Sequence, residues 1–322
     1  MKRKRSQQSF QTAEPTSLLS RTYDKAAKEF LAMRQILAPI LQETVTEFRH
    51  FSLETIERDC IENAPWISSI PVDPGRTNRK SRHRLTRKIR SLGTEQSDRD
   101  EGYITFDLLF YARVPDTGDR IKFLINIEAQ RSDPDYPLYK RAYFYANRLT
   151  SSQKERDFVG QDYGNICKVY TIWLCFYLPE GEKSSVTHYE IREVNDVGDH
   201  HEVKTTYDLI NITLVYVGND EIQSKLLRFL RLIFLSRLTD EALAQRLEKD
   251  FGIKADEDTK KEMKTMCNLS EGLKEETRIE SEGNIIINMI NEHLHLDIIE
   301  RVSGWTADQI RALAAKNGLV VE

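Results

Sequence analysis

Residues 103–130 read YITFDLLFYARVPDTGDRIKFLINIEAQ, and this stretch decides the fold. Apolar and polar residues alternate in Tyr103–Arg113 and again in Arg120–Gln130, which is the period of a β-strand. The intervening PDTGD carries the proline, aspartate and glycine that favour a tight turn. With Thr117 and Gly118 at the centre of this turn, the sequence predicts a hairpin in which residues whose numbers sum to 235 face each other.

Two acidic side chains lie opposite each other in this register. Asp107 faces Glu128, and directly opposed residues have Cβ atoms about 4.5–5.5 Å apart. Two such carboxylates repel each other unless a cation lies between them. An oxygen-ligated divalent ion such as Mg²⁺ would remove the repulsion. The alternative is a sheet face exposed to solvent, on which both acids are hydrated.

The segments around the hairpin alternate between helical and strand-like patterns. Helical periodicity runs from Tyr23 to Phe48, with a kink or break expected at Pro39, and a short helix is expected after Ser52. One further helix and two buried strands follow: Tyr139–Gln153, Ile166–Leu178 and Tyr207–Val217. This succession predicts an α/β fold with a mixed sheet.

The chain of 322 residues is long enough for one large domain or two modest ones, at roughly 100–200 residues each. We expect a disordered tail at 1–20, an α/β domain at 21–220 and a helical C-terminal region at 221–322. The last region ends in two short helices around a Ser-Gly turn, where Thr306 and Gln309 match a capping box. Such tails serve packing or oligomerisation, here as a homodimer contact, or read DNA as a helix-turn-helix.

Composition excludes several classes of protein. The 4 cysteines form no CxxC pair, which is typical of reduced thiols in a cytoplasmic protein. No apolar run is long enough to span a bilayer, so no membrane partner is expected. No glycine-rich phosphate loop is present, which argues against nucleotide-driven chemistry.

A basic stretch interrupts a chain whose net charge is −4. Residues 76–90 read RTNRKSRHRLTRKIR and contain no acid. The stretch could bind DNA phosphates or be a solvated loop. The candidates for backbone contact are Arg82, Arg84, Arg87 and Lys88.

An Asp on one strand followed by Glu-x-Lys on the next is the core of the PD-(D/E)xK nucleases, and this chain has Asp107 and then Glu128-Ala129-Gln130. The surrounding sequence resembles the nuclease-family transposases of the recombination-promoting, Rpn-like branch, in which Glu-x-Gln is usual. The matching segments occur in the same order: ILAPILQETVTEF (36–48), EGYITFDLLFYA (101–112), INIEAQ (125–130), KRAYFYANRLTSSQ (140–153), YGNICKVYTIWLC (163–175) and MCNLSEG (266–272).

The resemblance implies a restriction-endonuclease-like fold, with a mixed central sheet flanked by helices, and a site for Mg²⁺ or Mn²⁺. Asp107, Glu128 and the carbonyl of Ala129 would hold the ion, and Glu47 on the first helix would complete the site. Glu47 could equally be a surface acid. Gln130 stands where related enzymes have the lysine that orients or deprotonates water; an amide can orient water but cannot take its proton.

Arg141 on the helix after the hairpin would contact a DNA phosphate or form a structural ion pair, and Tyr145 would share its face. The function implied is a Mg²⁺-dependent DNA endonuclease that serves transposition or recombination. Two alternatives remain open: a nucleic-acid-binding protein that keeps the fold without cleavage, and a protein-interaction module built on the helical C-terminal half.

Overall fold

The computed structural model describes most of the chain. The described ranges are 18–67, 95–98, 102–105, 107–115, 121–131, 133–221, 223–236 and 238–320. The chain divides into two compact units: one combines Met1–Ala26 with Thr265–Glu322, and the other is Ala27–Lys264. Among the described residues, no helix is long and apolar enough to cross a membrane.

The Ala27–Lys264 unit is built on a six-stranded sheet with strand order β1-β4-β5-β6-β8-β7. The central strands β5, β6 and β8 are parallel to one another, whereas β1, β4 and β7 run antiparallel to their neighbours. The strands are β1 (Ile61–Ile67), β4 (Leu108–Arg113), β5 (Lys122–Gln130), β6 (Lys168–Cys175), β7 (Ser185–Glu190) and β8 (Ile210–Tyr216). The predicted α/β class with a mixed sheet is confirmed.

The predicted register of the hairpin is also confirmed. Leu108 pairs with Ile127 and Leu109 with Asn126 in the antiparallel ladder of β4 and β5. The first predicted strand is, however, divided in two: β3 (Gly102–Thr105) pairs with β2 (Glu95–Asp98) in a separate two-stranded sheet, and β4 begins only at Leu108. Asp107 therefore lies just before β4. The centre of the predicted turn lies outside the described residues.

Helical elements precede β1 along the chain, and Phe48 within this segment packs against Phe123 on one face of the sheet. These elements are α1 (Leu18–Leu31), α2 (Arg34–Thr44), the 3₁₀ turn η1 (Thr46–Phe48), α3 (Leu53–Thr55) and the π-turn η2 (Ile56–Cys60). The break predicted at Pro39 occurs instead before α2, where Met33 has extended backbone angles (φ −68°, ψ 131°). Pro39 lies inside α2 with its ring buried, so packing of the helix against the core outweighs the lost hydrogen bond.

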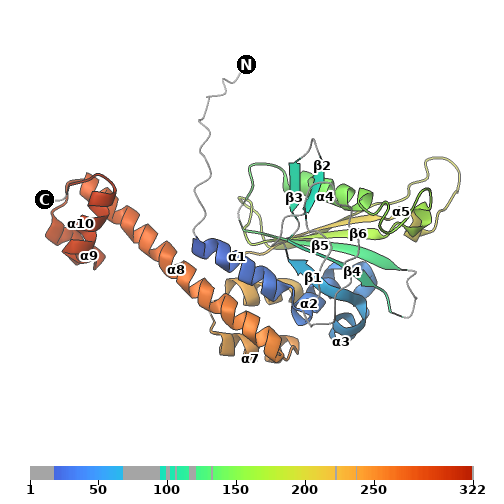
Figure 1. Ribbon diagram of the computed structural model, residues 1–322, viewed down its shortest axis with the longest axis horizontal. Coiled ribbons are helices and arrows are strands. Elements are labelled where there is room, and N and C mark those ends of the chain that lie inside the picture. Colours follow the sequence, from blue (N-terminus) through green and yellow to red (C-terminus); the bar gives the residue numbers. More distant parts are fainter. Residues whose placement is uncertain are drawn as a thin grey trace, which may run out of the picture. The chain divides into compact units, whose positions relative to one another are not determined.

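Helix α4 (Leu138–Ser151) covers the opposite face of the sheet (Figure 1). Its buried residues pack with alternate residues of the central strands, including Leu124, Trp173 and Leu214. The strand residues between these point to the other face, where the Phe123 ring lies 5.7 Å from Phe48 and 5.5 Å from Tyr170. Both faces of the central strands are therefore buried, which explains why β6 reads as an almost unbroken apolar run.

The remaining elements are mostly helical. They are η4 (Tyr163–Asn165), α5 (Lys204–Tyr207), α6 (Lys225–Leu230), the π-turn η5 (Arg231–Leu235), α7 (Asp240–Phe251), α8 (Glu257–Asn291), α9 (Leu296–Ser303) and α10 (Ala307–Lys316). The last two helices share a small core that includes Ile299 and Ile310. The predicted capping box is present, since Thr306 and Gln309 each accept a backbone N–H from the other end of the turn.

Phe123→Ala tests the packing of the sheet against the N-terminal helices. Phe123 is 1% exposed, so removing its ring leaves a cavity and should lower the free energy of unfolding by about 3–5 kcal/mol. Urea denaturation followed by circular dichroism measures the change. Val197→Ala is the control: Val197 is 94% exposed and its truncation should change stability by less than about 0.5 kcal/mol. Equal midpoints for both variants would contradict the assigned packing.

Candidate functional site

The candidate site lies at the edge of the sheet where the parallel strands have their carboxyl ends. Glu128 and Gln130 are among the last residues of β5, and Asp107 precedes β4, which runs antiparallel to β5. Helix α4 begins shortly after β5 and therefore starts at the same edge. In open α/β sheets, ligands bind outside the carboxyl ends of the strands.

The structure brings Asp107 and Glu128 together through a crossed pair of hydrogen bonds. The backbone N–H of Asp107 donates to Oε1 of Glu128 at 3.3 Å. The backbone N–H of Ala129 donates to Oδ2 of Asp107 at 2.9 Å. Each carboxyl group thus accepts a hydrogen bond from the backbone of the other strand, and this fixes both groups beside each other although the ladder of β4 ends at Leu108.

Glu128 is in an environment that disfavours its charge. Its side chain is 5% exposed, under the face of the sheet that α4 covers. Burial, and next the charge of Asp107, raise the pKa of Glu128 well above its ordinary value, while Arg141 acts in the opposite direction. The alternative in which both acids lie hydrated on an open sheet face is therefore wrong for Glu128.

Lys28 supplies a positive charge to the acid pair, and the sequence did not point to it. The Lys28 ammonium on α1 lies 2.7 Å from Oδ1 of Asp107, and both side chains are largely buried, at 17% and 14% exposed. The sequence feature that could have indicated it is a basic residue in the last turn of an amphipathic helix, beside the buried Phe30 and Leu31. Nothing local in the sequence pairs that residue with the hairpin.

Arg141 lies on the first turn of α4, among a group of aromatic rings, and its charge acts on Glu128. It donates hydrogen bonds to the hydroxyl of Tyr136 at 2.5 Å and to that of Tyr145 at 2.9 Å. Its guanidinium carbon is 5.3 Å from the centroid of the Trp173 ring, and Trp173 is the ladder partner of Glu128. Arg141 and Tyr145 do share a face, as their spacing predicts, and the arginine is held in place by neutral hydroxyl groups.

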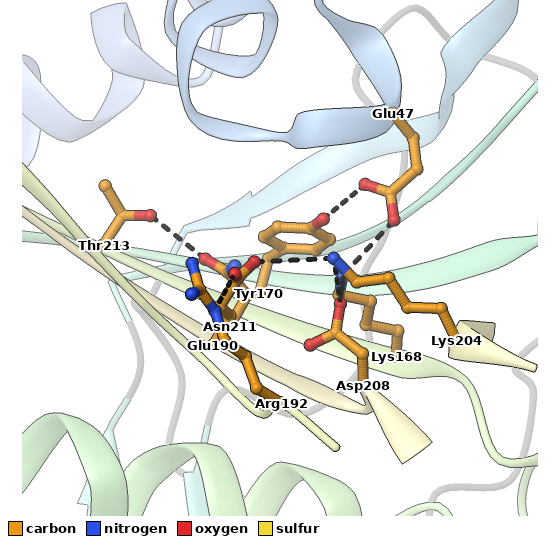
Figure 2. Close-up of polar contacts among 9 residues, drawn as sticks. All are labelled: Glu47, Lys168, Tyr170, Glu190, Arg192, Lys204, Asp208, Asn211 and Thr213. Carbon is orange, nitrogen blue, oxygen red and sulfur yellow. Dashed lines mark hydrogen bonds and ion pairs between the residues drawn. The ribbon is translucent and has the colours of Figure 1, made fainter. Parts of the chain in front are cut away.

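Glu47, which the resemblance places at the metal site, lies elsewhere. Its carboxylate accepts hydrogen bonds from the Tyr170 hydroxyl and, at 3.3 Å, from the Lys168 ammonium (Figure 2). Lys168 starts β6, five residues before Trp173 and so roughly 16 Å along the strand from the level of Glu128. Tyr170 also points to the opposite face of the sheet. One ion could not contact Glu47 and Glu128 together, because their faces and strand ends differ.

The contacts of Glu47 form part of a polar network between the 3₁₀ turn η1 and strands β6 to β8, in which Asp208 is the only charged residue that is fully buried. Lys168 donates to Asp208 at 2.7 Å, and Asp208 is 3% exposed. Lys204 lies 3.7 Å from Asp208 and 3.5 Å from Glu190. Figure 2 shows these side chains converging from separate segments. The network balances each buried acid with a base, which is a structural role.

The remaining candidates are the basic residues proposed to contact DNA and the possible metal ligands. Arg82, Arg84, Arg87 and Lys88 lie outside the part of the chain that the structure describes. Within the described ranges, no group of three or more His, Cys, Asp or Glu side chains could hold a metal ion. The acid pair therefore offers two carboxylates, with the Ala129 carbonyl and the Gln130 amide as neutral oxygen donors nearby in sequence.

Comparison with known proteins adds no assignment: no protein-family model, curated protein or solved structure matches this chain. Any function of this chain is therefore inferred from the residues of the site and from their geometry.

Glu128→Gln tests the charge state of the acid pair through the pH dependence of stability. The raised pKa means that folded Glu128 keeps its proton at pH values where the unfolded chain, with a pKa near 4.5, has lost it. The folded state then binds more protons, so stability falls as pH rises from about 4.5 to the folded pKa, by about 1.4 kcal/mol for each pH unit.

The glutamine variant lacks this proton and should lose less stability between about pH 5 and about pH 8. Unfolding by urea at the two pH values measures the difference. Glu180→Gln, at an exposed position, should follow the wild-type pH dependence. A Glu128→Gln curve parallel to that of the wild type would show that Glu128 ionises normally in the folded chain.

Proposed function

We propose that this chain is a metal-dependent DNA endonuclease that hydrolyses phosphodiester bonds, of the PD-(D/E)xK type that its sequence resembles. One observation carries the proposal: Asp107 and Glu128 lie side by side, joined by crossed hydrogen bonds, at the carboxyl edge of a mixed sheet flanked by helices. The resemblance pairs the same two residues. Transposition or recombination of mobile DNA is the process that it implies.

The donor atoms of the site suit Mg²⁺ or Mn²⁺. Mg²⁺ is commonly held by one or two carboxylates, with water and substrate phosphate completing its coordination. Asp107 and Glu128 would hold the ion, with the Ala129 carbonyl as a further oxygen donor. The raised pKa of Glu128 and the ion pair between Asp107 and the Lys28 ammonium both reflect the electrostatic cost of placing two carboxyl groups together. A bound cation would reduce this cost. A bound ion would polarise the scissile phosphate and lower the pKa of a bound water.

The other polar residues of the edge would act on the substrate. Alternation along β5 places Gln130 on the same face as Glu128, where its amide can orient the attacking water by hydrogen bonding. Arg141 carries a fixed guanidinium close to the acid pair, and this group binds phosphate oxygens in two-point contacts. The hydroxyls of Tyr136 and Tyr145 hold the guanidinium in orientation before substrate arrives.

A second candidate function is a DNA-binding protein with the same fold and little or no cleavage. The observation that favours it is the ion pair between Lys28 and Asp107, which already satisfies one carboxylate without a metal. In this interpretation, the presence of Gln130 where related nucleases have a lysine reflects a loss of catalysis. DNA is the binding partner in both candidate functions. A homodimer through the helical C-terminal region stays a prediction.

Plasmid cleavage separates the two functions. The purified chain with Mg²⁺ or Mn²⁺ should nick supercoiled DNA, and Asp107→Ala should lower the rate by at least about 100-fold, because one of the two carboxylate ligands is lost. Glu47→Gln is the matched acid control and should keep wild-type cleavage, since Glu47 lies on the other face of the sheet. DNA binding without nicking by the wild type would favour the second function, and loss of nicking only in Glu47→Gln would refute the assigned site.

Lys28→Met tests whether the lysine and a metal compete for Asp107. Without metal, the variant leaves a largely buried carboxylate unpaired and should lose about 3 kcal/mol of stability. With Mn²⁺, the ion no longer has to displace an ammonium group, so the variant should reach half-maximal thermal stabilisation at a lower Mn²⁺ concentration. Lys260→Met, which breaks an exposed and solvent-screened pair with Glu257, should keep a stability close to that of the wild type. An unchanged Mn²⁺ dependence would argue that no ion binds at Asp107.

A further inference from the structure

The outer face of α4 exposes an unusual number of aromatic rings. Tyr136, just before the helix, is 44% exposed, and Phe144 is also 44% exposed. Tyr139 and Tyr143 are 37% and 53% exposed, and their rings stack with centroids 6.4 Å apart. We call these four residues the α4 aromatic surface. A contiguous group of exposed large rings indicates a binding surface more often than it indicates packing.

This surface contains a pocket beside the candidate site. Tyr136, Pro137, Lys140, Arg141 and Phe144 line a hollow of about 470 Å³. Two of the residues that line it, Tyr136 and Phe144, carry aromatic rings, and its two charged residues are both basic. The helix as a whole carries three basic residues and no acid, which complements the charge of a nucleic-acid backbone.

Arg141 connects the pocket to the acid pair. Its guanidinium donates to Tyr136, which lines the pocket, and to Tyr145, which is buried beneath the helix. The same charge acts electrostatically on Glu128. A strand whose phosphate lay on Arg141 would therefore have a base within reach of Tyr136 and Phe144, and a phosphodiester bond near the acids.

We infer that the pocket holds an unpaired base of single-stranded DNA, between the rings of Tyr136 and Phe144, with Lys140 and Arg141 on the neighbouring phosphates. Rings bind the faces of bases, and these faces are accessible only when the base is not stacked in a duplex. The phosphates of a duplex could contact the two basic residues, but its stacked bases could not contact the rings. The inference rests on the proposed function and narrows its substrate to DNA with unpaired segments.

The test compares Phe144→Ala with the wild type in binding to a labelled oligothymidine strand and to a duplex of equal length. Fluorescence anisotropy in EDTA measures affinity without cleavage. The wild-type chain should prefer the strand; Phe144→Ala should weaken strand binding about tenfold, as loss of one base–ring stack does, and leave duplex binding within about twofold. Phe144→Tyr keeps a ring and should retain affinity, whereas Phe144→Leu keeps apolar bulk without a ring and should lose it.

Tyr163→Ala is the matched control, since Tyr163 is 61% exposed but lies in η4, outside the residues that line the pocket, and the variant should bind as the wild type does. Equal losses for strand and duplex, or strand binding that does not depend on Phe144, would overturn the inference. Self-association that Phe144→Ala abolishes, with DNA binding unchanged, would overturn it in favour of a second copy of the chain.

The outcomes separate this inference from the proposed function. Phe144-dependent strand binding by a chain that nicks no plasmid would support the pocket and refute the nuclease. Metal-dependent nicking with strand binding that is indifferent to Phe144 would support the nuclease and refute the pocket.

Discussion

Two carboxyl groups held side by side away from water cannot both ionise without a nearby positive charge, and the candidate site is organised around this constraint. The crossed hydrogen bonds fix Asp107 and Glu128 together, and α4 excludes solvent from the face on which Glu128 lies. The chain meets this constraint in part with the Lys28 ammonium, and in part through the raised pKa of Glu128, which favours the protonated form of that carboxyl group. Under the proposed function, a bound metal ion would take the place of this internal cation and proton.

Helix α4 contributes both to the packed core and to the candidate site at the carboxyl edge of the sheet. Its buried face closes the core over the central strands, and the same packing desolvates Glu128. Its outer face presents aromatic rings and basic groups to solvent. Arg141 belongs to both environments, because it contacts the buried Trp173 and the exposed Tyr136. A single helix therefore influences the ionisation of Glu128 and also forms the surface beside it.

The two faces of the sheet carry different kinds of polar group. On the face away from α4, Glu47, Lys168 and Asp208 balance one another at the amino ends of β6 and β8. Such a network holds segments together and has little reason to recruit a ligand. On the face beneath α4, the charges at the carboxyl end of β5 are less completely balanced. This difference, more than the identity of the residues, distinguishes a candidate site from a structural cluster.

The sequence by itself determined the α/β class, the register of the β4–β5 hairpin and therefore the pairing of Asp107 with Glu128, because strand periodicity and turn chemistry are local. It also determined the capping of α10 by Thr306 and Gln309. Only the tertiary structure decided that Lys28 contacts Asp107, that Glu47 lies on the other face, and that the polar side of the hairpin is buried. These depend on how distant segments pack, and periodicity along one segment says nothing about which helix will cover it or which charged group that helix will bring.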